Sequence, residues 1–79
     1  MKKIVNETTV EMVAVESKNM SYVGYSEEKA FMVIDFIRGP VYVFDNVPKE
    51  TYETLLSTET KDDYFNENIK NSFKNKRIM

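Results

Sequence analysis

Apolar residues alternate with polar ones through the first half of the chain and recur every three to four positions in the second half. Between residues 10 and 44 the period is close to two, which predicts short β-strands separated by polar turns. Residues 30–37 give the strongest strand signal, because they carry apolar side chains on both faces. Such a strand is typical of the centre of a sheet with a cover on each face. Residues 41–44 then return antiparallel after the turn at Gly39-Pro40.

The second half of the chain predicts two helices. Pro48 suits the first helical position, since its missing N–H would be unpaired there anyway. Tyr52, Leu55 and Leu56 follow at helical spacing and form an apolar stripe. Residues 60–63 resemble a capping box, which predicts the start of a second helix there. That helix carries its apolar side chains at every fourth position, namely Phe65, Ile69 and Phe73.

Strands followed by helices predict an α+β fold. We expect a small antiparallel sheet of three to four strands, followed by two C-terminal helices packed on one face. Residues 1–9 are predicted to form an N-terminal arm or edge strand, and residues 10–77 a single domain. Because the helices cover one face only, we expect a ligand or a second copy of the chain on the other. A homodimer or higher oligomer formed through the sheet is therefore predicted.

Composition removes several classes of function. The 79 residues include neither Cys nor His, which excludes disulfides, zinc–thiolate sites and nucleophile–base pairs built on these residues. Two glycines leave no Gly-rich phosphate loop. The 13 acidic and 11 basic residues give a net charge of −2, which argues against an electrostatic clamp spanning the domain. The sequence predicts a protein that is not an enzyme and needs no cofactor or metal.

Two features of the chain bear on its location. Lys2 and Lys3 begin like a signal peptide, but polar residues 6–9 interrupt the apolar segment that would have to follow. The sequence also lacks an apolar run of about 18 residues that could cross a membrane. We therefore expect a cytoplasmic protein without membrane contacts.

The order and spacing of several short segments resemble the KTSC family, which is named for a segment at the C-terminus of some lysyl-tRNA synthetases. The family also occurs as stand-alone bacterial and phage proteins. The resemblance runs from about Val13 to Arg77, and it rests chiefly on Val23-Gly24-Tyr25, Phe31 to Phe36, Tyr42-Val43-Phe44, Val47-Pro48, Phe65-Asn66 and Ile69-Lys70. It implies an RNA-binding role. In this chain Phe44 takes the place of the second Tyr in the family's Tyr-x-Tyr motif. A ring at this position can still stack on a base, but it has no phenolic hydroxyl to offer.

Candidate binding residues come from two segments. Tyr42 and Phe44 lie two residues apart on one face of a strand, where they either stack on bases or pack into the core against the helices. The need of so small a domain for buried rings favours the core. Arg38 lies at the adjacent turn. Further candidates are predicted on the second helix, toward its C-terminal end, namely Asn66, Lys70, Lys74 and Arg77.

The basic side chains near the C-terminus, including Lys76, are expected at the end of the second helix. There they either contact phosphates or simply complement the helix dipole. Asn66 and Lys70 are four residues apart and share one helix face.

Two classes of function follow. The first is a non-catalytic module that binds RNA or a nucleotide, as the family resemblance implies. The alternative is a small phage-type accessory protein that binds a host protein or sequesters a small nucleotide. The net acidity favours the second class, and the setting of the family favours the first.

Overall fold

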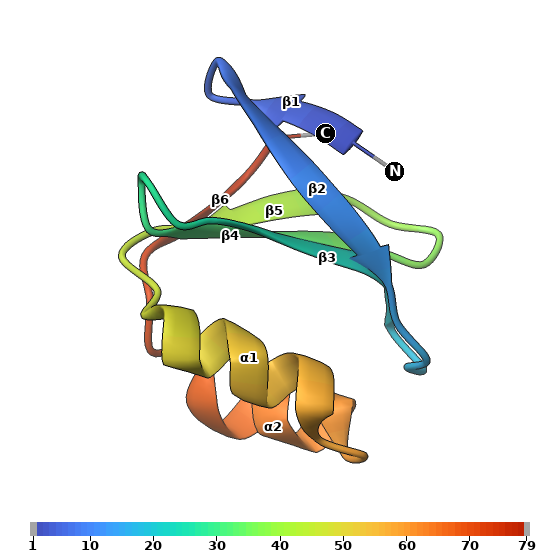
Figure 1. Cartoon of the computed structure of the whole chain (residues 1–79). Helices are drawn as coiled ribbons and strands as arrows, with labels where there is room; N and C mark the ends of the chain where they lie inside the picture. The colour runs from blue at the N-terminus through green and yellow to red at the C-terminus, as the bar shows by residue number, and fades with distance from the viewer. Residues whose placement is uncertain (1, 79) are drawn as a thin grey trace.

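Six antiparallel strands follow one another across the sheet in the order in which they occur in the sequence (Figure 1). A computed structural model describes residues 2–78, so Met1 of the predicted N-terminal arm lies outside the described residues. The strands are β1 (Lys2–Val5), β2 (Thr8–Ala14), β3 (Met20–Ser26), β4 (Phe31–Phe36), β5 (Val41–Phe44) and β6 (Asn75–Arg77). The helices α1 (Lys49–Ser57) and α2 (Lys61–Asn68) lie between β5 and β6 in the chain.

The α+β class and the two helices are confirmed, but the predicted strand number of three to four is wrong. The additional strands at the two edges carry almost no hydrophobic pattern. In β1 only Val5 is buried, and all three residues of β6 are exposed. The strand β6 forms because it pairs with β5. Its residues Arg77, Lys76 and Asn75 lie opposite Tyr42, Val43 and Phe44.

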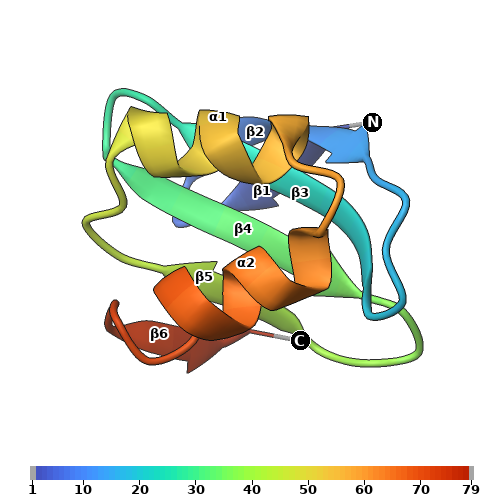
Figure 2. The ribbon, with the colours of Figure 1, turned by 90° about the horizontal axis from the view of Figure 1, so that it is seen from below.

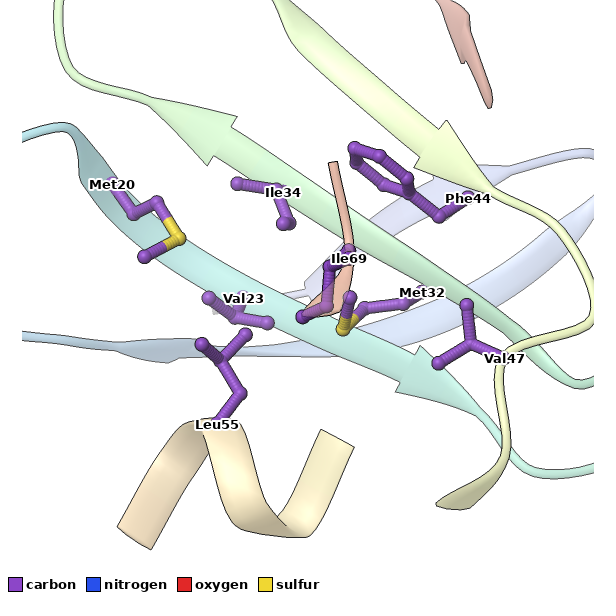
Figure 3. Close-up of a cluster of buried hydrophobic side chains, with 8 residues drawn as sticks. All are labelled: Met20, Val23, Met32, Ile34, Phe44, Val47, Leu55 and Ile69. Carbon is purple, nitrogen blue, oxygen red and sulfur yellow. The ribbon is translucent and has the colours of Figure 1, made fainter. Parts of the chain in front are cut away.

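Both helices pack against one face of the sheet (Figures 1 and 2). Between them and the strands lies a hydrophobic core, drawn in Figure 3. The strands contribute Met20, Val23, Met32, Ile34 and Phe44, and the segments after β5 contribute Val47, Leu55 and Ile69. Each helix supplies little of this core by itself. Leu55 is the one buried residue of α1, and Ile69 follows directly on the last residue of α2.

The β1–β2 hairpin folds over the opposite face of the sheet, which Figure 1 shows on the side away from the helices. Val5, Val10 and Met12 of this hairpin pack with side chains of β4 and β5, chiefly Phe31, Val33, Val41 and Val43. The expectation that a ligand or a second copy covers this face is therefore wrong. The chain covers it with its own first two strands, which removes the reason for predicting self-association through the sheet.

Gly24 allows the hairpin to fold so closely over the sheet. A Cβ atom at this position would lie 2.5 Å from Sδ of Met12 and 2.7 Å from Cγ1 of Val10. These distances are shorter than van der Waals contact, so only glycine fits. Gly24 thus marks the point at which β2 passes over β3.

The predicted second helix is too long at its C-terminal end. It ends at Asn68, after which the amide of Lys70 donates to the carbonyl of Phe65 and the amide of Ser72 to that of Ile69. Asn68, Asn71 and Ser72 are weak helix formers, and the exposed edge of β5 offers new backbone hydrogen bonds to the chain. Phe65 and Phe73 still pack against the helix-side core together with Ile69.

The predicted capping box is also absent, because no side-chain hydrogen bond caps α2 at Thr60.

Neither helix within residues 2–78 is long and apolar enough to cross a membrane.

Candidate ligand-binding groove

A groove of about 610 Å³ opens on the helix side of the sheet, between α2 and the β5–β6 edge. Phe65 and Asn66 line it from α2, and Tyr42 and Phe44 from β5. The turn between β4 and β5 closes one end with Ile37, Gly39 and Pro40. In Figure 2, α2 crosses in front of β4 and β5, with β6 beside it. The groove exists because two short helices do not cover the whole width of the sheet.

Four aromatic rings form the apolar wall of the groove. The ring of Phe36 lies edge-on to Tyr42, with ring centroids 5.8 Å apart, and to Phe65, at 5.7 Å. Phe44 is also edge-on to Phe65, at 5.7 Å, and its side chain is almost fully buried. Tyr42 is half-buried, 6.3 Å from Phe44. Of the two candidate rings, Phe44 thus belongs to the core, whereas Tyr42 lies at the boundary between the core and the groove.

The polar rim of the groove consists of amides and one ammonium group, from Asn19, Asn66, Asn71, Asn75 and Lys70. No Asp or Glu of residues 2–78 lines the groove, although the chain holds 13 acidic residues. Within the described part of the chain, the side chains of Asn66, Lys70 and Asn71 form no hydrogen bond or ion pair. Their donors and acceptors are therefore available to a ligand.

Comparison with known proteins identifies the family. The model of the KTSC domain matches residues 16–73. The chain belongs to the KTSC domain family. This confirms the resemblance seen in the sequence. The matched region contains both helices and most of the groove, while β1, β2 and β6 lie outside it.

Two similar proteins extend this result. An uncharacterized protein of Stutzerimonas stutzeri (strain A1501) is 29% identical over 58 residues, which cover 73% of this chain and 82% of that protein. The crystal structure of a KTSC domain protein from Yersinia pestis matches with a TM-score of 0.85 and 23% identity. The match covers 89% of this chain and 99% of that chain, so the two share the fold.

In this KTSC domain, the candidate cations lie on different segments of the chain. Lys70 lines the groove, but Lys74 is exposed in the connection to β6. Arg77 pairs with Tyr42 across the β5–β6 ladder, which places both side chains on the helix side of the sheet. Arg38 lies exposed in the turn at the end of the groove, with a φ of 58°. The predicted basic helix end is therefore wrong, because the helix ends before these residues.

Sequence reasoning missed the role of Asp62. Its carboxylate accepts hydrogen bonds from the Ser17 hydroxyl at 2.7 Å, the Lys18 amide at 3.0 Å and Nδ2 of Asn19 at 3.1 Å. Burial raises the pKa of Asp62, but these hydrogen bonds outweigh burial and hold its pKa below the ordinary value. Ser17 precedes Asp62 by 45 residues, and no local pattern in the sequence joins the two.

Proposed function

We propose that this KTSC domain is a non-catalytic module that binds single-stranded RNA by holding a nucleotide unit in the groove between α2 and β5. The observation that carries the proposal is the chemical character of the groove. In a protein of net charge −2, the groove combines aromatic rings, the unbonded amides of Asn66 and Asn71 and one lysine, and none of the described carboxylates lines it.

Each of these groups matches one part of a nucleotide. An Asn side chain offers both a donor and an acceptor, as the edge of a base requires. The half-buried ring of Tyr42 presents an aromatic surface of the kind on which bases stack. Lys70 supplies a positive charge for a phosphate, and no described acidic side chain of the groove opposes it.

The size of the groove favours one or two nucleotide units over a long polymer track. Its volume of about 610 Å³ lies within the range of small-molecule sites. That observation also supports the second candidate function, which is sequestration of a free nucleotide in the same groove.

Binding measurements separate these functions. The protein is titrated against a single-stranded RNA octamer, a tRNA and a panel of free nucleotides, each at two salt concentrations. Binding of the octamer, weakened by salt, is expected for the RNA-binding module. Tight binding of one nucleotide, with no gain from the polymer, would instead establish sequestration. No binding in any of the three would refute both and favour a protein partner.

Matched variants locate the binding site. Asn66→Ala and Lys70→Ala remove groove side chains that have no partner among residues 2–78, so they are expected to weaken octamer binding without changing stability. Lys2→Ala makes the same charge change on β1, at the other edge of the sheet, and serves as the control. If Lys70 contacts a phosphate, Lys70→Ala reduces the slope of log K against log salt by about 0.7, and Lys2→Ala leaves it unchanged.

Variants of Lys74 and Arg77 test how far the binding site extends. Lys74→Ala and Arg77→Ala change residues that do not line the groove. An effect as large as that of Lys70→Ala would extend the binding site from the groove toward β6.

A further inference from the structure

The loop between β2 and β3 is fastened to the start of α2 by a single carboxylate. Asp62 lies in the first turn of α2 and accepts hydrogen bonds from three consecutive residues of the loop, Ser17, Lys18 and Asn19. The Ser17 hydroxyl oxygen in turn accepts bonds from the amides of Asn19 and Met20, at 3.2 and 3.1 Å. The loop is thus held both to itself and to the helix.

Asn19 extends this connection to the end wall of the groove. Its carbonyl accepts a hydrogen bond of 2.8 Å from the amide of Ile37, and both residues line the groove. The same turn is closed by bonds from Gly39 to Phe36 and from Phe36 to Pro40. Three segments that are distant in sequence therefore meet at Asn19, namely the β2–β3 loop, the β4–β5 turn and α2.

The opposite wall of the groove lies on the same helix as Asp62. Asn66 follows Asp62 by four residues, so the two side chains lie on the same side of α2. Neither helix within residues 2–78 has a side-chain cap at its N-terminus. The bonds of Asp62 therefore attach the start of α2 to the β2–β3 loop.

We infer that Asp62, Ser17 and Asn19 form a latch that sets the distance between the two walls of the groove, and so positions Asn66 and the β4–β5 turn for the ligand. The inference rests on the proposed function. Ser17 and Asp62 act through Asn19 and α2, which makes them positioning residues.

The charges around the latch are mixed. Lys18, Glu59, Lys61 and Asp63 line the small pocket beside Asp62. Nζ of Lys61 donates to the carbonyl of Thr58 at 2.6 Å, so this cation is directed to the backbone. The lowered pKa of Asp62 agrees with a carboxylate that stays ionised and bonded at neutral pH.

Two measurements on the full chain test the latch. The first is amide hydrogen exchange at Ile37, which reports the bond to Asn19 without any ligand. The second is the affinity for the single-stranded RNA octamer. Asp62→Asn keeps the shape of the side chain but loses part of its acceptor capacity, and Ser17→Ala removes the hydroxyl. Ser17→Thr restores a hydroxyl, and Asp63→Asn makes the same charge change at an exposed neighbour.

Asp62→Asn and Ser17→Ala are expected to speed exchange at Ile37 and to weaken octamer binding, each by about tenfold. Ser17→Thr and Asp63→Asn should leave both values close to those of the unchanged protein. Unaltered exchange at Ile37 in both latch variants would overturn the inference, even if binding fell. Should the unchanged protein fail to bind the octamer, the proposed function fails, and exchange at Ile37 still decides whether the latch orders the groove wall.

Discussion

The two faces of the sheet are covered in different ways. On one face the covering layer is the β1–β2 hairpin, which continues the same sheet and places Val5, Val10 and Met12 over β4 and β5. On the other face, two helices of nine and eight residues lie across the strands (Figure 2). Side chains beside α2 leave a groove on this face. One face is closed by the chain itself, and the other stays partly open.

The difference concerns what holds each cover in place. The hairpin is joined to β3 through backbone pairing, since Met12, Val13 and Ala14 lie opposite Gly24, Val23 and Tyr22. The helices have no such ladder and depend on side chains, chiefly Leu55, Ile69 and the bonds of Asp62. Segments that open easily are those with few buried apolar contacts. We therefore expect the hairpin face to supply stability and the helix face to supply recognition.

The two ends of β4 give the sharpest test of this division. Phe31 is 4% exposed and packs under the hairpin, whereas Phe36 is half-buried in the groove wall. Phe31→Ala is expected to lower the free energy of unfolding by about 3–5 kcal/mol, and Phe36→Ala by about half as much. Urea unfolding measures both. Equal losses, or a larger loss at Phe36, would contradict the division.

Gly24 tests how tightly the hairpin cover fits. The methyl group of Gly24→Ala would press against Met12, Val10 and the carbonyl of Glu11, which requires β2 to move away from β3. Overpacking of this kind costs about 1–3 kcal/mol. Gly39→Ala is the matched control, because its nearest heavy atom lies at 3.5 Å, an ordinary contact. Thermal unfolding should show a clear fall in Tm for Gly24→Ala and little change for Gly39→Ala.

The parts of the fold that follow hydrophobic periodicity could be predicted from the sequence. The prediction of apolar side chains on both faces of β4 is confirmed, since Met32 and Ile34 lie in the core under the helices and Phe31 and Val33 in the core under the hairpin. The edge strands could not be found in this way, because β6 has only exposed residues and exists through its pairing with β5. The closed face was missed for a related reason, since folding the hairpin over the sheet depends on a contact at Gly24 that periodicity does not encode.

The groove was only partly predictable. Tyr42, Phe44, Asn66 and Lys70 were named as candidates, and the structure brings all four to its walls. Asn19 and the latch at Asp62 were missed, because a hydrogen bond between residues 45 positions apart leaves no local pattern. Whether these residues bind a ligand stays a prediction.

Tyr42 combines the two roles, stability and recognition, in one side chain. Its ring contacts Phe36 and Phe44, while its hydroxyl forms no hydrogen bond within residues 2–78. Tyr42→Phe keeps the ring, so the free energy of unfolding should change by less than about 0.5 kcal/mol. If the hydroxyl contacts the ligand, affinity for the RNA octamer falls by roughly two- to tenfold. Unchanged affinity would show that the hydroxyl does not contact the ligand and would leave the ring as the part of Tyr42 that the proposal needs.

The pH dependence of the latch is a further small effect on stability. Because the pKa of Asp62 is lower in the folded protein than in the unfolded chain, its contribution to stability is complete above about pH 4 and is lost as the pH falls through the folded pKa. Asp62→Asn should therefore be less stable than the unchanged protein at pH 7, by no more than about 1 kcal/mol for a partly exposed group.

This difference should shrink as the pH falls below about 4, because the carboxylate takes up a proton and loses acceptor capacity. Urea unfolding at several pH values measures this difference in stability directly. Asp63→Asn is the control for the general loss of a negative charge, because Asp63 forms none of the described hydrogen bonds to the loop. A difference that stays constant down to the lowest pH would mean that the ionised carboxylate is not what holds the loop to α2. Apolar packing alone would then hold the helices to the sheet. The hairpin is held by apolar packing too, but it also has its backbone ladder.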